Sequence, residues 1–144
     1  MVEHIKNKDI MLAIIIRTQF SVEGIEFFTP DDFSQQLAYM KRGEGYAIAP
    51  HGHNIVPRKI ELTQEVLLIK SGKVRVDFYD DDQKYLESYV LYAGDVILLA
   101  HGGHGLVMLE ESEIIEVKQG PYSSDKDKTR FEGVKTEDIK IKDQ

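Results

Sequence analysis

The chain has 144 residues, the size of one domain and enough to bury a hydrophobic core without covalent cross-links. It contains no cysteine, which excludes disulfides, thiolate metal ligands and thiol catalysis and fits a reducing, cytoplasmic setting. Its 25 acidic and 18 basic residues give a net charge of -7 with no basic patch, so we expect no nucleic-acid partner.

Residues 10–20 (IMLAIIIRTQF) predict a buried strand, because the run is apolar and rich in β-branched residues. The longest apolar run, residues 11–16, is six residues long, whereas a membrane helix needs roughly 20. We therefore expect no membrane partner. A strand of this kind outside the main fold needs a cover, and a two-fold homodimer is the expected source of one.

Residues 30–42 predict one helix. Thr29 is a capping residue, Pro30 suits the first helical position and Gly43 suits the stop. The apolar residues of the segment fall on one helical face, which we expect to pack against the sheet. They are Phe33, Leu37 and Met40.

Short strand-like runs separated by turn residues occupy most of the chain after this point. Such spacing predicts an all-β antiparallel sandwich or barrel. The runs are 45–50, 59–70, 73–79, 84–92, 95–99, 104–109 and 113–118.

We expect three parts along the chain. Residues 1–42 form an N-terminal strand and helix that pack on the barrel, residues 43–119 form the barrel, and residues 120–144 form a charged C-terminal arm. The arm has slight apolar alternation, enough for one edge strand or for a docked segment, and we expect it to dock.

Four of the five histidines fall in two short groups, His51 with His53 and His101 with His104. Residues two apart on a strand share a face, so His51 and His53 can point at one spot. Glu65 begins an apolar strand, and a carboxylate on an inner face costs stability unless it is paired or binds a cation. His104 begins a later strand in the same way.

Closing a barrel can bring these strand starts together. Three imidazoles and one carboxylate suit one divalent transition metal, and the residue types do not select among Fe, Mn, Ni, Co, Zn and Cu. The predicted ligands are His51, His53, Glu65 and His104. His101 lies in the neighbouring glycine-rich loop and is the candidate catalytic acid or base, because histidine ordinarily titrates near neutrality.

At these residues the sequence resembles the cupin superfamily. The first cupin motif is matched by Gly45, five residues, and His51-Gly52-His53, and later by Glu65, six residues, and Gly72 (EVLLIKSG). The second is matched by the stretch that begins at Gly94 (GDVILLAHGGHGLVM). The resemblance covers about residues 43–118. It implies a jelly-roll barrel (a double-stranded β-helix) that holds a metal.

The carboxylate of the first motif has a rival. The 11 residues between His53 and Glu65 exceed the usual gap of the family, so Glu61 is a second candidate. The spacing to Gly72 favours Glu65.

The histidine of the second motif also has a rival, His101. His104 falls one position early, Ala100 replaces the usual proline, and the motif's asparagine is missing. We favour His104 because it heads a strand.

Cupin membership does not select a reaction. The first hypothesis is a metal-dependent protein that acts on a small molecule in the barrel, by dioxygenase-type chemistry or by isomerase or epimerase chemistry of the sugar type. The alternative is a non-catalytic cupin that binds a small ligand, and a purely structural dimer is the third hypothesis. Arg58 either binds an anionic substrate or is an exposed loop residue. Tyr46 and Tyr89 are candidates to place a hydroxyl group in the pocket.

Overall fold

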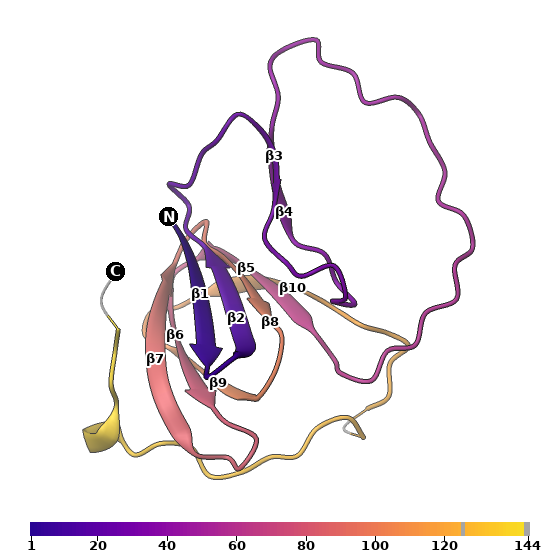
Figure 1. Ribbon diagram of the computed structural model, residues 1–144. Helices are drawn as coiled ribbons and strands as arrows, with labels where there is room; N and C mark the ends of the chain where they lie inside the picture. Colours follow the sequence, from indigo (N-terminus) through magenta and orange to yellow (C-terminus); the bar gives the residue numbers. More distant parts are fainter. Residues whose placement is uncertain (125, 143–144) are drawn as a thin grey trace. The chain divides into compact units, whose positions relative to one another are not determined.

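The computed structural model describes residues 1–124 and 126–142. The chain divides into two compact units (Figure 1). Unit 1 comprises Met1–Phe20 and Thr63–Gln144, and unit 2 comprises Ser21–Leu62. Every pairing between two of the strands that the structure describes is antiparallel, which confirms the predicted all-β antiparallel class. Within the described part the only helical element is a 3-10 turn at Thr136–Asp138, and no helix there could cross a membrane.

Unit 1 contains a five-stranded sheet. Its strand order is β1 (Val2–Asn7), β2 (Ile10–Ile16), β8 (Val96–Leu99), β5 (Glu65–Ser71) and β10 (Glu113–Lys118). The predicted N-terminal strand, β2, is therefore internal, because β1 and β8 pair with its two edges. We expected a homodimer because this apolar strand needs a cover, and β1 and β8 already cover its two edges. The homodimer itself stays a prediction.

A second, three-stranded sheet completes unit 1. Its order is β7 (Tyr85–Tyr92), β6 (Lys73–Tyr79) and β9 (Gly103–Met108). Among the described residues the two sheets remain open, so the structure has no closed barrel. Strand β9 is an edge of this sheet, and β10 is an edge of the five-stranded sheet.

One hydrophobic core lies between the two sheets. Alternate residues of each strand point into it, as the two-residue period of a strand requires. Ile15, Leu67 and Ile97 come from the five-stranded sheet, and Val76 and Phe78 come from the three-stranded sheet. We call the sheet faces that carry these side chains the inner faces.

The helix predicted over residues 30–42 is wrong. Residues 30–37 form turns, and Ala38–Lys41 (β4) pairs with Gly24–Phe27 (β3) in a two-stranded sheet of unit 2. Thr29 does not cap a helix, because its Oγ1 accepts the amide of Leu37 at 3.1 Å and donates to the side chain of Gln36 at 2.8 Å. A short isolated helix is marginal in water, so these competing turn bonds and the strand pairing are sufficient to replace it.

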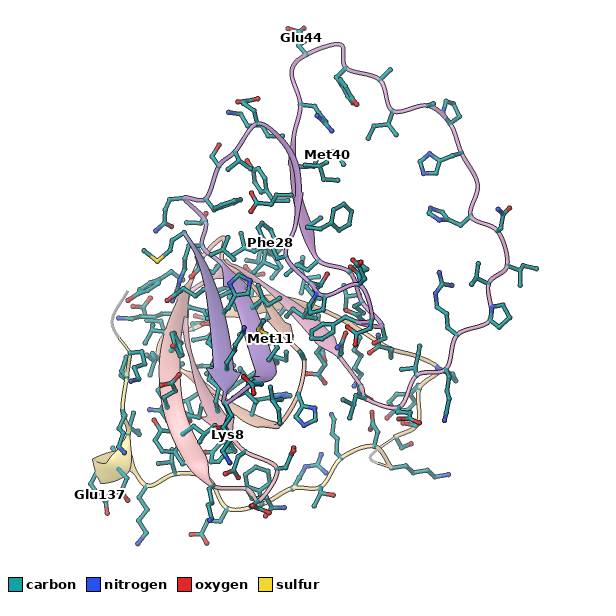
Figure 2. The ribbon with its side chains drawn as sticks, viewed as in Figure 1. Lys8, Met11, Phe28, Met40, Glu44 and Glu137 are labelled. Atoms are coloured by element: carbon teal, nitrogen blue, oxygen red, sulfur yellow. The ribbon has the colours of Figure 1, made fainter. Side chains whose placement is uncertain are left out.

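The strand predictions over 45–50 and 59–64 are also wrong. Residues 42–64 form no strand or helix, and the chain after Glu44 projects its side chains from an irregular backbone (Figure 2). Each of the other predicted strands corresponds to a strand of unit 1, β5 to β10, within a few residues. Tyr46 and Ile48, and likewise Ile60 and Leu62, are two residues apart as in a strand, so spacing alone did not distinguish paired from unpaired segments.

Arg17 lies at one end of the unit 1 core, with 2% of its surface exposed. Its guanidinium donates to Asp95 Oδ2 at 2.8 Å, to the carbonyl of Val90 at 2.7 Å and to Glu3 Oε2 at 2.5 Å. Asp95 is also buried and accepts the amide of Thr18 at 2.9 Å. The group joins the end of β2 to β1, β7 and the turn before β8, and every buried charge in it has a partner, as burial requires.

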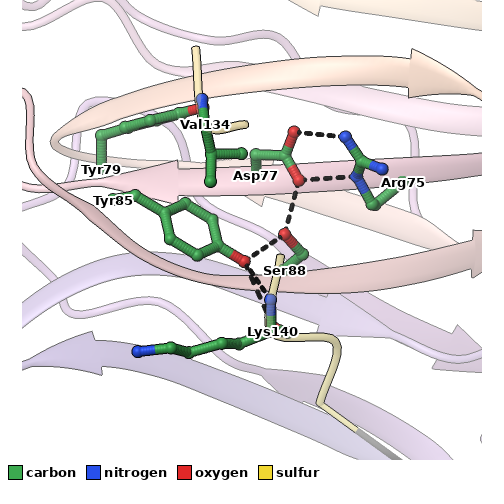
Figure 3. Close-up of polar contacts among 7 residues, drawn as sticks. All are labelled: Arg75, Asp77, Tyr79, Tyr85, Ser88, Val134 and Lys140. Carbon is green, nitrogen blue, oxygen red and sulfur yellow. Dashed lines mark hydrogen bonds and ion pairs between the residues drawn. The ribbon is translucent and has the colours of Figure 1, made fainter. Parts of the chain in front are cut away.

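The C-terminal arm contacts the outer side of the three-stranded sheet (Figure 3). The amide of Val134 donates to Tyr79 Oη at 2.9 Å, and the amide of Lys140 donates to Tyr85 Oη at 2.8 Å. Ser88 forms a parallel bridge with Ile141 at the edge of β7. The described part of the arm therefore contacts unit 1 through its backbone.

A buried polar network lies beneath this arm. Arg75 binds Asp77 through two hydrogen bonds of 2.8 and 3.0 Å, and Ser88 donates to the same carboxylate at 2.5 Å (Figure 3). Tyr85 Oη is 2.7 Å from Ser88 Oγ. The network thus connects β6 and β7 to the arm.

Candidate metal centre

Glu65 and His104 meet at one end of the inner faces. Glu65 is the first residue of β5 and shares the inner face with Leu67, and His104 pairs with the buried Phe78 of β6. His104 Nε2 lies 3.3 Å from Glu65 Oε2, with side-chain exposures of 32% and 14%. The structure therefore brings together two of the four predicted ligands, one from each sheet, at a position that solvent can reach.

The electrostatic surroundings favour an ionised Glu65. The hydrogen bond with His104 lowers the pKa of the Glu65 carboxyl, and this outweighs the opposing effect of partial burial. The charges of His104, Lys118 and Lys128 lower the same pKa further. An ionised carboxylate beside an imidazole is the state that binds a cation.

His51 and His53 lie together in unit 2, in the irregular segment and not on a strand. Their ring centroids are 5.4 Å apart. His51 Nδ1 lies 2.8 Å from the carbonyl of Ala49. A carbonyl only accepts, so Nδ1 is the donor and Nε2 of the neutral ring is free to bind a metal.

His101, the predicted acid or base, lies in the turn before β9. Its Nε2 is 3.0 Å from Asp81 Oδ2, which comes from the turn between β6 and β7. This carboxylate partner was missed at the sequence level, because the two turns are adjacent only in the folded sheet. An Asp that binds one ring nitrogen fixes the orientation of the ring.

The rival residues have other partners in the structure. Glu61 is exposed and pairs with Lys59 at 2.8 Å, and Arg58 donates to the carbonyl of Val56 at 3.5 Å. Tyr46 is stacked by the guanidinium of Arg42 at 4.6 Å from the ring centroid. Tyr89 donates to Glu87 at 3.2 Å.

Several of the motif glycines are required by the backbone, and Gly72 and Gly94 are two of them. Gly72 and Gly94 have φ values of 85° and 90°, in the region that disfavours side chains. A Cβ at Gly72 would overlap the carbonyl of Glu111, and one at Gly94 would overlap Thr18. Their presence in the motif therefore has a structural reason that is independent of any metal.

The donor set can be tested against the geometry of each pair. Ligand atoms that lie about 2.0 to 2.2 Å from one ion in tetrahedral geometry are about 3.3 to 3.6 Å apart, and two imidazoles on one ion have ring centres about 5 Å apart. The Glu65–His104 and His51–His53 separations match these two values. Among the residues that the structure describes, no group of three or more His, Asp or Glu side chains is close enough to hold a metal.

Lys118 was also missed at the sequence level. It pairs with Glu65 in the β10–β5 register and therefore lies on the inner face. The signal was available in the alternation of Ile114, Glu116 and Lys118 along one strand, since Ile114 packs against the core.

The comparisons with known proteins identify no relative. The chain matches no protein-family model, and no curated protein and no solved structure shows significant similarity to it.

Proposed function

We propose that this chain is a metal-binding protein of the cupin type that acts on a small molecule. The part of the site in unit 1 is Glu65 with His104, and His51 and His53 are predicted as further ligands on the sequence alone. The observation that carries the proposal is the approach of His104 Nε2 to Glu65 Oε2. The two residues come from different sheets, and the first motif predicted Glu65 whereas the second predicted His104.

The internal geometry of each pair supports this proposal. A carboxylate and three imidazoles are nitrogen and oxygen donors suited to a divalent transition metal. Two protein ligands are fewer than the three or four that such sites use, so the Glu65–His104 pair requires further ligands. The cupin-like motif supplies the inference that His51 and His53 are these ligands, and the free Nε2 of His51 is consistent with it.

The proposed chemistry involves the metal and His101. A bound metal would act as a Lewis acid on a carbonyl or enediolate, or would bind dioxygen if it is iron. His101 would transfer a proton, with Asp81 holding its ring in one orientation. A non-catalytic ligand-binding protein is the alternative, and it predicts that substitution of His101 leaves ligand affinity unchanged.

Metal analysis of the purified protein tests the proposal. We expect one equivalent of Mn, Fe(II), Ni or Zn after titration and dialysis, as measured by elemental analysis. Glu65→Gln should lower the stoichiometry, whereas the exposed rival, in Glu61→Gln, should leave it at one. Failure of the wild-type protein to bind any of these four metals would refute the metal site.

A further inference from the structure

Strand β9 leaves one edge of the three-stranded sheet without a partner strand in the described part of the chain. We infer that this edge is a contact surface between two copies of the chain. Strand β9 of one copy pairs with β9 of the second copy, antiparallel and about a two-fold axis at Leu106, so that the two three-stranded sheets become continuous. The inference goes beyond the proposed function, and it requires no metal.

The edge of β9 lacks the features that normally keep sheet edges apart, which are charges, irregular register and a covering segment. Strand β1 has a break in its register after Ile5, and β10 has one after Glu113. The bridge between Ser88 and Ile141 lies at the edge of β7. Strand β9 has an unbroken register with β6 and contains no Pro, Asp, Glu, Lys or Arg. Among the described strands at the edges of unit 1, β9 is therefore the one most open to a further strand.

Exposed apolar side chains follow one another along this edge. Leu106, Val107, Met108 and Leu109 are 37%, 40%, 47% and 42% exposed. A continuous apolar edge of this kind is a site of association with another strand. The chain has a net charge of -7, so two copies repel each other over most of their surface. A contact between two uncharged edges avoids this repulsion, which favours a second copy as the occupant.

The backbone groups at the open edge determine the register. The amide of Leu109, one residue beyond β9, donates to the carbonyl of Lys73 at 2.8 Å, in continuation of the β9–β6 register. Backbone groups alternate in direction along an antiparallel strand, so those of His104, Leu106 and Met108 point to the open edge. A two-fold axis at Leu106 pairs Leu106 with Leu106 of the second copy and His104 with its Met108. All the outward N–H and C=O groups of these three residues then form hydrogen bonds.

The same register places large side chains opposite glycines. Val107 of one copy faces Gly105 of the other, and Leu109 faces Gly103. A Cβ at Gly105 would have only ordinary contacts, the nearest at 3.9 Å, so there is room for the opposing valine. At Gly103 the ring of Phe131 lies 2.8 Å from the place of a Cβ, so the opposing leucine packs against that ring. The sequence of the edge is therefore complementary to itself in size.

Cross-linking through one introduced cysteine tests the register, because the chain has no cysteine of its own. Leu106→Cys should form an intermolecular disulfide in diamide, since directly opposed residues have Cα atoms about 5.5 Å apart, within the span of a disulfide. Met108→Cys is the matched control. It lies on the same face and is more exposed, but the register separates the two copies of residue 108 by about 13 Å along the strands.

Charged substitutions test the interface without a covalent bond. Sedimentation equilibrium of the full chain in EDTA, from micromolar to millimolar concentration, should show a reversible dimer. Leu106→Lys and Leu106→Glu each place like charges together at the two-fold axis and should weaken the dimer more than about tenfold. An equimolar mixture of the two variants should restore it, because the opposed charges then differ in sign. Ile115→Lys, at an exposed position of β10, is the control and should leave the dimer unchanged.

Several results would overturn the inference. A chain that stays monomeric up to millimolar concentration would refute the pairing, and so would a dimer that Ile115→Lys disrupts and Leu106→Lys does not. Equal cross-linking of Leu106→Cys and Met108→Cys would refute the register. Circular dichroism shows whether the charged variants fold, and if they do not, the comparison of the two cysteine variants decides. Because EDTA is present throughout, none of these outcomes depends on the proposed metal site.

Discussion

His104 approaches Glu65 across the space between two sheets, with 3.3 Å between Nε2 and Oε2. Each residue stands at one end of its strand and shares a face with core side chains. The contact therefore depends on the packing of the sheets and not on any local turn. A buried core of apolar residues determines which polar side chains meet at its end.

The clearest prediction concerns the two histidines of the second motif. His104→Ala should weaken zinc binding by more than about 100-fold, because loss of a ligand exceeds the 10- to 100-fold cost of losing a partner that only orients one. His101→Ala should leave zinc affinity within a few-fold of wild type, because its ring contacts Asp81. Calorimetric titration with zinc measures both. The reverse order of effects would show that His101 is the ligand.

Arg17 provides a prediction on stability. Arg17→Met should lower the free energy of unfolding by about 3 to 5 kcal/mol, because it leaves the buried carboxylate of Asp95 without its charged partner. Lys70→Met, which removes an exposed ion pair with Glu113, should cost less than about 1 kcal/mol. Urea unfolding followed by circular dichroism distinguishes them. Equal losses would mean that the Arg17 network adds no more than a surface pair.

Tyr89 predicts a stability change at alkaline pH. Burial and the nearby charges of Glu87 and Glu3 raise its pKa from 10.0 to about 12. The folded state thus keeps a proton that the unfolded state has released. The stability from this group is complete below pH 10.0 and is lost as the pH rises to about 12. Urea unfolding midpoints measured between pH 9 and pH 12 should therefore fall as the pH rises. Tyr89→Phe should make this fall smaller, whereas Tyr122→Phe, at an exposed tyrosine, should leave it unchanged.

The C-terminal arm should loosen when Tyr85 loses its hydroxyl. Tyr85→Phe removes the bonds to Ser88 Oγ and to the amide of Lys140, at a cost of about 1 to 2 kcal/mol. Amide hydrogen exchange at Lys140 should become faster, and exchange in β5 should be unchanged. Tyr92→Phe, at a partly exposed tyrosine, is the control. Unchanged exchange at Lys140 would show that the strand bridge at Ser88 holds the arm by itself.

The sequence by itself determined the class of the fold and most of its strands. The predicted run 73–79 coincides with β6, in which Val74 and Val76 lie in the core, because a strand between two layers must bury alternate side chains. The same pattern placed Glu65 and His104 at the starts of inward-facing series. The glycine spacing identified Gly72, which has a positive φ and no room for a Cβ.

Tertiary structure decided the remaining features. Thr29 and Pro30 are strong local signals for a helix, but strand pairing and the side chain of Gln36 prevailed, because local propensity is weaker than the bonds of a formed sheet. The pairing of Arg17 with Asp95 joins residues 78 positions apart, and no local pattern reports such a contact. Whether an apolar stretch becomes a paired strand, and which charges it meets when it does, depends on partners that are distant in the sequence.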